Sequence, residues 1–356
     1  MLCGMQEMMT VNGVAVSVSV GMTVWEAARS VGVAVPVLCH REGLHPSGGC
    51  GVCTVEDVAT GRLLPACASR ADNAMRIETD SERARAHRRV ALELLLSNHP
   101  ADCEAPCQMA CPAGLPVPAL MRLVADDQWA VAVALARRYP LSCENVPCEK
   151  VCRRKPLGGA VSICAIHRLL ADAPAGCDEP SVPVQRLAGK VRFRSRMTGL
   201  PEKALLALAR EKGLRTELPG HAEFTRHHAR YESARCLQCG CQKAEACRLR
   251  DLCADVGAKQ ATFAGERSAI VRGNDGRGFA FDSSRCVLCG ICVRTASALG
   301  ASVAPTFRGR GFDAHIAPPL GRTWGDVPAD VLAACAAACP TGAMANINNQ
   351  HGVSDD

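Results

Sequence analysis

Aromatic residues are scarce in this chain, which has only 3 tryptophans, 2 tyrosines and 7 phenylalanines among its 356 residues. Large aromatic side chains supply much of the buried surface in ordinary cores, so small modules in this chain need another source of stability. Bound metal can provide it, because the free energy of metal binding is also free energy of folding. The shortage of aromatics therefore directs attention to metal ligands.

Long apolar segments are also missing. The opening residues, MLCGMQEMMTVNG, show no basic region followed by an apolar run, and no later stretch approaches 18 uninterrupted apolar residues. We therefore expect a cytoplasmic protein with no membrane span. The formal charge of +6 is small for 356 residues, and the arginines stand beside cysteines, where they would stabilise negatively charged clusters. We expect no nucleic-acid partner.

Glycine motifs for nucleotide binding are absent as well. The stretches RGNDGRGF and FRGRGF have neither the spacing nor the context of G-x-G-x-x-G between a strand and a helix. No P-loop and no nucleophile with a neighbouring base is visible. The chain alone therefore shows no site for hydride transfer, phosphoryl transfer or nucleophilic catalysis, so substrate oxidation must occur on another protein.

Cysteine is what the chain has in abundance, with 23 residues, and in a cytoplasmic protein this indicates metal or redox chemistry. The first run is spaced C-x10-C-x2-C-x13-C, with the glycine-rich stretch HPSGGCGVC around its middle pair. Glycine lets a backbone curl around a cluster and direct N–H groups at its sulfurs. Upstream, VAVSVSV alternates like a strand, and MTVWEAARSVG predicts a helix with Thr23 as its N-cap. The run consists of Cys39, Cys50, Cys53 and Cys67.

Residues 9 to 79 resemble the 2Fe-2S domain at the N-terminus of NADH dehydrogenase large subunits, iron-only hydrogenases and NAD-dependent formate dehydrogenases. The segments PVLCH, CGVCTVE and MRIETDS carry the resemblance. It implies a β-grasp-like ferredoxin domain whose four cysteines hold one 2Fe-2S cluster. The spacing differs from the plant-type pattern but keeps its central C-x2-C, and a zinc site is the alternative.

The second run contains two cysteine loops, SNHPADCEAPCQMACPAG and LSCENVPCEKVC, joined by a segment with helical periodicity, PVPALMRLVADDQWAVAVALARRYP. Through GGAVSICAIHRLLAD it resembles the helical double-cluster domain that precedes the flavin domain in the small subunit of glutamate synthase and in dihydropyrimidine dehydrogenase. In that family two 4Fe-4S clusters exchange ligands between the loops. The flavin domain that would follow near residue 180 is missing.

The resemblance implies a set of ligands for each cluster of this helical domain. One cluster would take Cys103, Cys107 and Cys152, and the other would take Cys111, Cys143 and Cys148. For the fourth ligands, His99 stands near the place of the family's first cysteine, and His167 falls on the family's late Gln or Glu position. Cys164, three residues before His167 on the same predicted helix, is an alternative.

The third run, YESARCLQCGCQKAEACRLRDLCADVGA, resembles a short cysteine-rich segment found after the flavin domain in some glutamate-synthase-like electron-transfer proteins. We expect one 4Fe-4S cluster here, although tetrahedral zinc also tolerates such spacing. The expected ligands are Cys236, Cys239, Cys241 and Cys247, which leaves Cys253 spare.

The fourth run, DSSRCVLCGICVRT followed later by AACAAACPTGA, has the C-x2-C-x2-C and distant C-P of bacterial ferredoxins. A second ferredoxin cluster would need a cysteine where Ala296 stands, so we expect one 4Fe-4S cluster and no evident role for Cys335. Its ligands would be Cys286, Cys289, Cys292 and Cys339.

Together these runs predict an α+β multi-domain protein with a β-grasp-like 2Fe-2S ferredoxin, an α-helical 4Fe-4S double-cluster domain and a C-terminal ferredoxin-like 4Fe-4S module. The expected boundaries are 8–79 for the ferredoxin, 80–177 for the helical domain, 178–230 for a linker, 231–265 for the cysteine-rich segment and 266–347 for the last module.

The predicted function is that of an iron-sulfur electron-transfer subunit of a cytoplasmic oxidoreductase complex of the formate dehydrogenase, hydrogenase or NAD(P)H-linked type. It would pass single electrons through one 2Fe-2S and about four 4Fe-4S clusters. Its partners would be a flavoprotein or NAD(P)H-binding subunit and a metal-dependent catalytic subunit. The alternatives are a stand-alone oxidoreductase with an unrecognised cofactor site, or a structural or regulatory metal protein with zinc in the third run.

Overall fold

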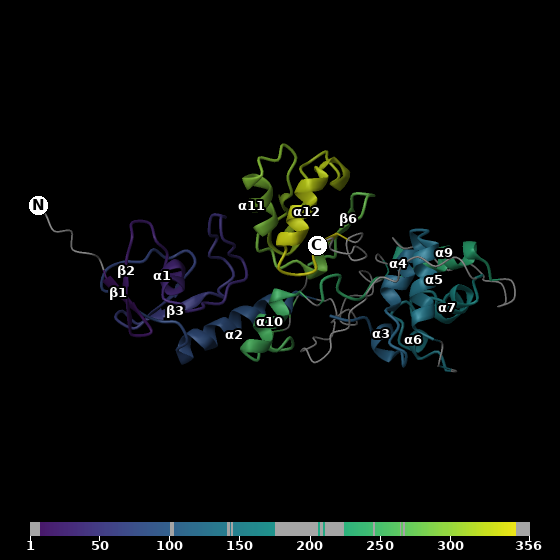
Figure 1. The fold of residues 1–356 in the computed structure, drawn as a ribbon, viewed down its shortest axis with the longest axis horizontal. Helices are drawn as coiled ribbons and strands as arrows, with labels where there is room; N and C mark the ends of the chain where they lie inside the picture. The colour runs from purple at the N-terminus through teal and green to yellow at the C-terminus, as the bar shows by residue number, and fades with distance from the viewer. Residues whose placement is uncertain are drawn as a thin grey trace, which may run out of the picture. The chain divides into compact units, whose positions relative to one another are not determined.

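The computed structural model divides the chain into two compact units (Figure 1). Unit 1 combines Met1–His99 with Ala246–Ala345, and unit 2 combines Pro100–Glu245 with Asn346–Asp356. The C-terminal module thus shares a unit with the N-terminal ferredoxin domain, whereas the sequence suggested separate modules in a row. The structure describes residues 8–99, 103–140, 143, 145–174, 206, 209–210, 224–244, 246–263, 265 and 268–346.

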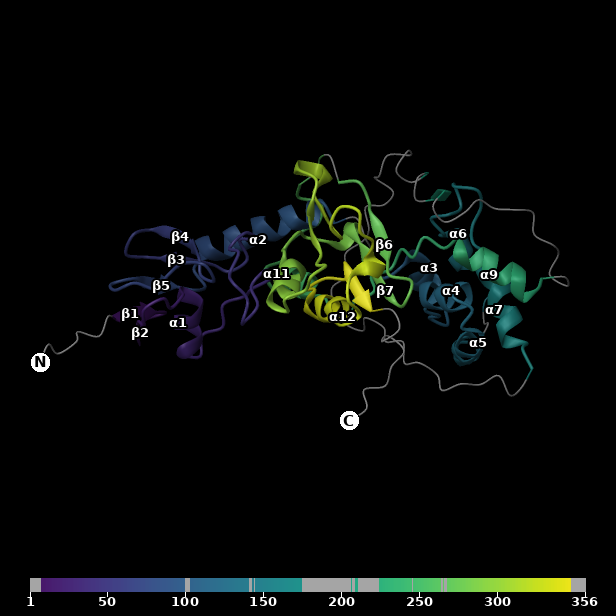
Figure 2. The same ribbon diagram turned by 90° about the horizontal axis from the view of Figure 1, so that it is seen from above.

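The ferredoxin domain of unit 1 contains a five-stranded sheet with the strand order β2-β1-β5-β3-β4 (Figure 2). β1 pairs with β5 in parallel, and the other neighbours pair antiparallel. Side chains alternate between the two faces of a strand, so Met9 and Val11 of β1 lie on one face and join Val16 of β2 in a buried cluster. The strands are β1 (Met8–Val11), β2 (Val14–Ser17), β3 (Thr54–Asp57), β4 (Arg62–Pro65) and β5 (Arg76–Glu78).

Local sequence signals explain the start of this domain. Asn12 and Gly13 both have positive φ, at 49° and 78°, which is the backbone that an Asn-Gly hairpin turn between β1 and β2 requires. Helix α1 (Val24–Ser30) begins where the sequence predicts, because Thr23 and Glu26 form a capping box. The helix buries Val24 together with two alanines against the sheet.

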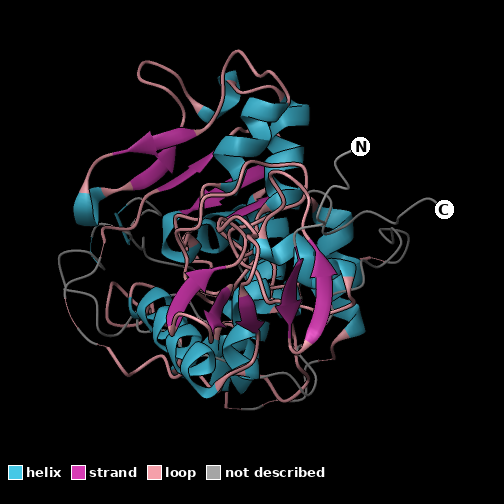
Figure 3. Cartoon of the chain, turned by 90° about the vertical axis from the view of Figure 1, so that its left-hand side faces the viewer, coloured by secondary structure: helices cyan, strands magenta, loops and turns pink. Residues whose placement is uncertain are grey.

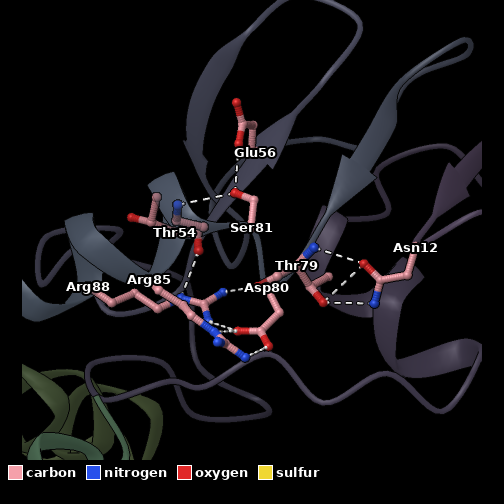
Figure 4. A network of polar contacts seen from close by, with 9 residues as sticks. Asn12, Thr54, Glu56, Thr79, Asp80, Ser81, Arg85 and Arg88 are labelled. Carbon is pink, nitrogen blue, oxygen red and sulfur yellow. Dashed lines mark hydrogen bonds and ion pairs between the residues drawn. The ribbon is translucent and has the colours of Figure 1, made fainter. Parts of the chain in front are cut away.

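Helix α2 (Glu82–Ser97) is fixed to the sheet by a polar network (Figure 4). The Ser81 hydroxyl donates to Glu56 at 2.6 Å and also caps the helix. The buried Arg88 guanidinium donates to the carbonyl oxygens of Thr54, at 2.9 Å, and of Thr79. The sheet and the helix that leaves it are therefore firmly joined, and the helix carries the chain to the end of the first half of unit 1.

The C-terminal module of unit 1 pairs two small sheets with helices α11 (Ile291–Ala298) and α12 (Ala329–Ala338). Three of the chain's few aromatic side chains lie in its core. The ring centroids of Phe279 and Phe281 are 5.0 and 5.2 Å from that of Trp324. Trp324 lies directly over Gly273, where a Cβ would come within 2.4 Å of the indole. The strands are β6 (Arg272–Asn274), β7 (Phe279–Asp282) and β10 (Met344–Asn346), with β8 (Thr306–Arg308) and β9 (His315–Ala317) as a separate pair.

Short elements complete unit 1. Helix α10 (Arg248–Asp255) packs against α2, and single-turn 3-10 helices join the longer elements of the C-terminal module. The 3-10 helices are η3 (Ser283–Arg285), η4 (Gly311–Asp313) and η5 (Trp324–Asp326).

Unit 2 is helical over its described residues, in contrast to the mixed helix and strand of unit 1 (Figure 1). Figure 3 colours the helices and strands of the described residues. The predicted helical pair is confirmed as α4 and α5, whose apolar faces enclose a core with α7 and α9, including Leu120, Val133 and Ile166. The helices are α3 (Pro106–Ala110), α4 (Val117–Ala125), α5 (Trp129–Arg138), α6 (Pro147–Lys150), α7 (Ile163–Ala171) and α9 (Arg226–Ala234).

The predicted linker, 178–230, lies largely outside the described residues. From Phe224 onward the chain is described, and α9 begins at Arg226 with Ala229 buried in the helical core. The linker and its boundaries stay a prediction. Across the described ranges, no helix is long and apolar enough to cross a membrane.

Candidate iron-sulfur centres

The four cysteines of the first run meet inside the ferredoxin domain. The Cys53 thiol donates to the sulfur of Cys67 at 3.3 Å, and the Cys39 sulfur interacts with the thiols of Cys50 and Cys67. The Ser47 hydroxyl donates to Cys39 as well, at 3.3 Å. These hydrogen bonds, those from Cys50 and Cys67 most strongly, lower the pKa of the Cys39 thiol.

The chain achieves this convergence with a loop that requires glycine. Gly48 and Gly51 have φ of 64° and 69°, and a Cβ at either position would stand 3.0 Å from the Cβ of Ala68 or Ala91. The loop is thus packed both onto the Cys67 segment and onto α2. Four thiols held together, three of them almost fully buried, form the donor set that a 2Fe-2S cluster requires, so the residues present fit this group.

The fourth run surrounds a cavity of about 330 Å³ in the C-terminal module. The cavity is lined by Cys286, Cys289, Cys292 and Cys339, together with Pro340 and other residues. Burial raises the pKa of Cys286 to about 12, against the opposing hydrogen bond from the Leu288 N–H and with a smaller contribution from Cys339 and Cys289. Thiols placed around a buried volume fit a 4Fe-4S cluster, whose iron would favour the thiolate form.

Cys335, for which the sequence suggested no role, has a structural one. Its side chain is fully buried on α12, and its thiol donates to the carbonyl oxygen of Cys292 on α11 at 3.3 Å. It therefore ties together the two helices that carry the ends of the fourth run. Cys253, also spare in the sequence, is fully buried on α10.

Arg294 joins the ligand loops of the first and fourth runs within unit 1. One terminal nitrogen of its guanidinium donates to the carbonyl oxygens of Cys39, at 2.6 Å, and Cys289, at 3.1 Å. The other donates to the carbonyl of His45 at 2.6 Å, and Nε donates to that of Gly290 at 3.3 Å. A single cation is thus shared by two predicted cluster loops, a contact that no spacing pattern in the sequence indicates.

In unit 2, Cys148 lies among the other cysteines expected to share its cluster. Its pKa is raised to about 12 by burial first, then by Glu149, Cys164 and Cys111. The Cys164 thiol in turn is hydrogen-bonded to that of Cys143. The structure therefore brings Cys164, rather than His167, to the set of Cys111, Cys143 and Cys148.

His167 has a different environment. It is buried on α7, and its Nε2 donates to the carbonyl oxygen of Ala136 on α5 at 2.9 Å. This bond supports the packing of two helices. The alternative considered for the fourth ligand, Cys164, lies one helical turn earlier on the same face.

Cys107 lies close to cysteines from two other parts of the chain. Burial raises its pKa well above the usual value, and Cys236, Cys239, Cys152 and Cys148 raise it further, in that order. The proximity of Cys107 to Cys152 is what the predicted exchange of ligands between the two cysteine loops requires. The approach to Cys236 and Cys239 was not predicted, because those residues were expected to belong to a separate cluster.

The remaining predicted ligands are distributed over both units. Cys103 and Cys241 are joined by a backbone hydrogen bond in unit 2, from the Cys241 N–H to the Cys103 carbonyl at 3.3 Å. Cys247 belongs to unit 1, where it caps α10 and the next N–H donates to the carbonyl of Pro340. The structure therefore does not gather the four cysteines of the third run in one unit.

His99 also belongs to unit 1, whereas Cys103 and Cys107 belong to unit 2. Burial and then Arg285 lower its pKa to about 4. Its Nδ1 is buried and has no hydrogen-bond partner among the described residues, and its carbonyl oxygen accepts from Gln260 at 3.0 Å. Its ligand role stays a prediction. Among the described side chains, no group of three His, Cys, Asp or Glu converges on a point where a single metal ion would fit.

Comparison with known proteins identifies the first domain. Residues 8–82 match the family model of the 2Fe-2S iron-sulfur cluster binding domain. The 78 kDa subunit of mitochondrial NADH-ubiquinone oxidoreductase from Candida albicans is 38% identical over 94 residues, which are 26% of this chain and 13% of that protein. The alpha subunit of NADPH-Fe(3+) oxidoreductase from Geobacter sulfurreducens is 34% identical over 95 residues, or 27% of this chain and 11% of that protein.

One subunit of the NADH-quinone oxidoreductase from Rickettsia bellii is 36% identical over 95 residues, which are 27% of this chain and 14% of that protein. The chain thus spans 11–14% of the length of these curated relatives. A chain in the crystal structure of an NAD+-reducing NiFe hydrogenase in the H2-reduced state aligns with a TM-score of 0.52 at 18% identity. The alignment covers 95% of this chain and 86% of that chain, and it is a likeness of fold.

These comparisons confirm the resemblance of the N-terminal residues to the 2Fe-2S domain of NADH dehydrogenase large subunits. They also confirm a mixed α+β fold with a small ferredoxin-type sheet domain. The first run therefore lies in an iron-sulfur domain, and the relatives that share it are subunits of oxidoreductases.

Proposed function

We propose that this chain is an iron-sulfur electron-transfer subunit of an oxidoreductase complex, which passes single electrons through a 2Fe-2S cluster and several 4Fe-4S clusters. The observation that carries the proposal is the Arg294 guanidinium, which donates to the backbone of Cys39 in one predicted ligand loop and of Cys289 in another. Two redox sites held this closely form a path for electrons.

The charge of Arg294 suits this role. A cluster gains negative charge when it is reduced, and a guanidinium that contacts both ligand loops favours the reduced form of either cluster. Arg294 contacts the backbone of both loops, so its charge would stabilise the added electron on whichever of the two clusters held it. The hydrogen bonds from Arg294 to the backbone of the two loops therefore support the proposal that electrons pass between the ferredoxin domain and the C-terminal module.

The partners we propose are a flavoprotein or NAD(P)H-binding subunit at one end and a metal-dependent catalytic subunit at the other, working in the cytoplasm. The names of the relatives support a nicotinamide-linked partner, because they belong to NADH-quinone, NADH-ubiquinone and NADPH-Fe(3+) oxidoreductases. Two-electron donors of this kind need a flavin to divide the electron pair, and electrons then leave one at a time.

The test is anaerobic reconstitution of the full chain followed by visible absorbance during mixing with NADH or NADPH. We expect no bleaching at enzymatic rates by the nicotinamide alone and rapid bleaching once a nicotinamide-oxidising flavoprotein is added. Bleaching without the flavoprotein, or a flavin that copurifies tightly with the chain, would show a complete reductase instead. A colourless reconstituted chain would overturn the iron-sulfur assignment altogether.

A further inference from the structure

Unit 2 contains a cavity of about 400 Å³, partly open to solvent, between segments that are far apart in the sequence. Four of its lining residues are cysteines, and two others are arginines. The cysteines are Cys107, Cys152, Cys236 and Cys239, and the arginines are Arg153 and Arg154.

We propose that Cys107, Cys152, Cys236 and Cys239 are the four ligands of one 4Fe-4S cluster. The second run would then supply two ligands and the third run the other two, so that the C-x2-C of the third run completes a centre of the helical domain. This inference rests on the iron-sulfur chemistry proposed above and changes the assignment of its ligands.

The third run is fixed to the helical domain at the right place. Gly240 follows Cys239, and a Cβ added there would stand 3.3 Å from the backbone nitrogen of Ala105, the N-cap of α3. Cys107 lies two residues further along on this short helix. The next residue of the loop, Cys241, donates its N–H to the carbonyl of Cys103. The loop therefore lies along the segment that presents Cys107.

Buried charge anchors the other side of this loop. Arg235, directly before Cys236, is fully buried and pairs with Glu232 at 2.6 Å. It also donates to the carbonyl oxygens of Gly158 and Gly159 at 2.9 and 3.0 Å. Glu232 accepts from the N–H of Ser162 at 3.0 Å. The end of α9, and with it Cys236, is thus tied to the segment between α6 and α7.

The charges around the cavity match a cluster that bears four thiolates. Arg154, almost fully buried, lines the cavity and donates to the carbonyl of Ala209 at 2.7 Å. Arg154 lies close enough to the buried Arg235 for each charge to act on the other. The charge of Arg235 is balanced by Glu232, so it is the buried guanidinium of Arg154 that offsets part of the negative charge that an iron-sulfur cluster brings into the interior.

A double-substitution experiment distinguishes one shared site from two separate ones. In the anaerobically reconstituted full chain, Cys107→Ser and Cys239→Ser should each remove about four iron atoms per chain, and the double variant should lose no more than either single one. Losses that add, to about eight iron atoms, would overturn the proposal, as would full retention of iron in either single variant. Cys253→Ser, at a cysteine outside every predicted ligand set, is the control and should keep all its iron.

Three further readouts protect this result. Electron paramagnetic resonance of the 2Fe-2S cluster in unit 1 shows whether each variant has folded and taken up iron. Cysteine-to-alanine variants at the same positions test whether a serine oxygen has replaced the thiolate as an iron ligand. Zinc instead of iron at the site would overturn the cluster assignment. This outcome is distinguishable from failure of the proposed function, because none of these measurements involves electron transfer to a partner.

The unmodified protein offers an independent test. During gradual chelation of iron, thiol alkylation followed by mass spectrometry should label Cys107, Cys152, Cys236 and Cys239 at one common rate, because they lose protection together. Labelling of Cys236 and Cys239 in step with Cys241, but not with Cys107, would contradict the proposal.

Discussion

The ferredoxin domain and unit 2 gather their cysteines in opposite ways. In the ferredoxin domain, Cys39, Cys50, Cys53 and Cys67 fall within a short stretch of chain, and one glycine-rich loop brings them together. In unit 2, a single cavity is lined by cysteines from Cys107 to Cys239, which are more than a hundred residues apart in sequence. Sequence spacing therefore groups the cysteines that meet in the ferredoxin domain, and it does not indicate which cysteines line the cavity of unit 2.

The largest expected effect tests whether the 2Fe-2S site of the ferredoxin domain forms independently of the predicted 4Fe-4S sites. Cys67→Ser should abolish the 2Fe-2S signal in electron paramagnetic resonance and leave the 4Fe-4S signals intact, because all four ligands lie in one domain. Cys335→Ser is a control from the same unit, since its thiol donates to the carbonyl of Cys292 and lies outside the first run. Loss of a 4Fe-4S signal in Cys67→Ser would show that the first site is not self-contained.

The next effect tests how firmly the third run is held in unit 2. Glu232→Gln leaves the buried Arg235 without its ion-pair partner, and removing one partner of a buried pair typically costs about 3–5 kcal/mol. We expect thermal unfolding of unit 2 at a lower temperature, measured by circular dichroism, and faster loss of iron. Glu82→Gln, an exposed residue of α2, should change neither, and an unchanged melting temperature in Glu232→Gln would contradict the anchoring role.

A smaller effect tests the contact between the two loops of unit 1. Arg294→Ala removes hydrogen bonds to Cys39, His45 and Cys289, none of which is fully buried, so we expect a combined loss of about 1.5–3 kcal/mol. Amide hydrogen exchange in both loops should become faster, and the reduction potentials of both clusters should fall, because a nearby positive charge is lost.

Arg294→Lys separates the two contributions of this side chain. Lysine keeps the charge but not the planar fork of donors, so it should restore the potentials and leave the exchange rates high. Unchanged potentials in Arg294→Ala would show that the guanidinium only supports the loops.

The smallest effect is a pH dependence confined to the ferredoxin domain. Burial alone would raise the pKa of Asp57, but hydrogen bonds from Thr60 and from the N–H groups of Arg76 and Ala59 outweigh it, and the net pKa is lowered. A lowered carboxyl pKa stabilises the fold above the unfolded pKa of about 4, and the stabilisation is lost as the pH falls through the folded value.

Asp57→Asn should therefore destabilise the domain by about 1–3 kcal/mol at pH 7, with a difference from wild type that shrinks as the pH falls below about 4. The midpoint of thermal bleaching of the 2Fe-2S absorbance at several pH values measures it, with the exposed Asp72→Asn as control. A difference that stays constant with pH would rule out the carboxylate as its cause.

Local features of this fold could be predicted from the sequence because their causes are local. The N-cap at Thr23 follows from its spacing to Glu26, and the α4–α5 pair follows from apolar periodicity. Cys164 could be named as an alternative ligand to His167 because it lies three residues earlier on the same predicted helix. Its contact with Cys143, and that of His167 with Ala136, depend on how α7 packs in unit 2, which spacing does not encode.

Other features depend on where distant segments meet, which spacing does not encode. Nothing near Arg294 in the sequence indicates that its guanidinium reaches the loop of Cys39. The grouping of Cys236 with Cys107, and the place of Cys247 in the other unit, follow from how the chain returns to unit 2 and then to unit 1. In the first case, residues far apart in sequence are neighbours in space.

The division of unit 1 into two stretches of chain also sets an order of events during translation. Residues up to 99 leave the ribosome first, all but the last few residues of unit 2 follow, and residues 246–345 come after them. Domains generally fold in the order in which they emerge. The loop of Cys39 must therefore wait for Arg294 while unit 2 is synthesised, so a nascent chain that stalls before residue 294 would present an unfinished first half to the iron-delivery machinery of the cell.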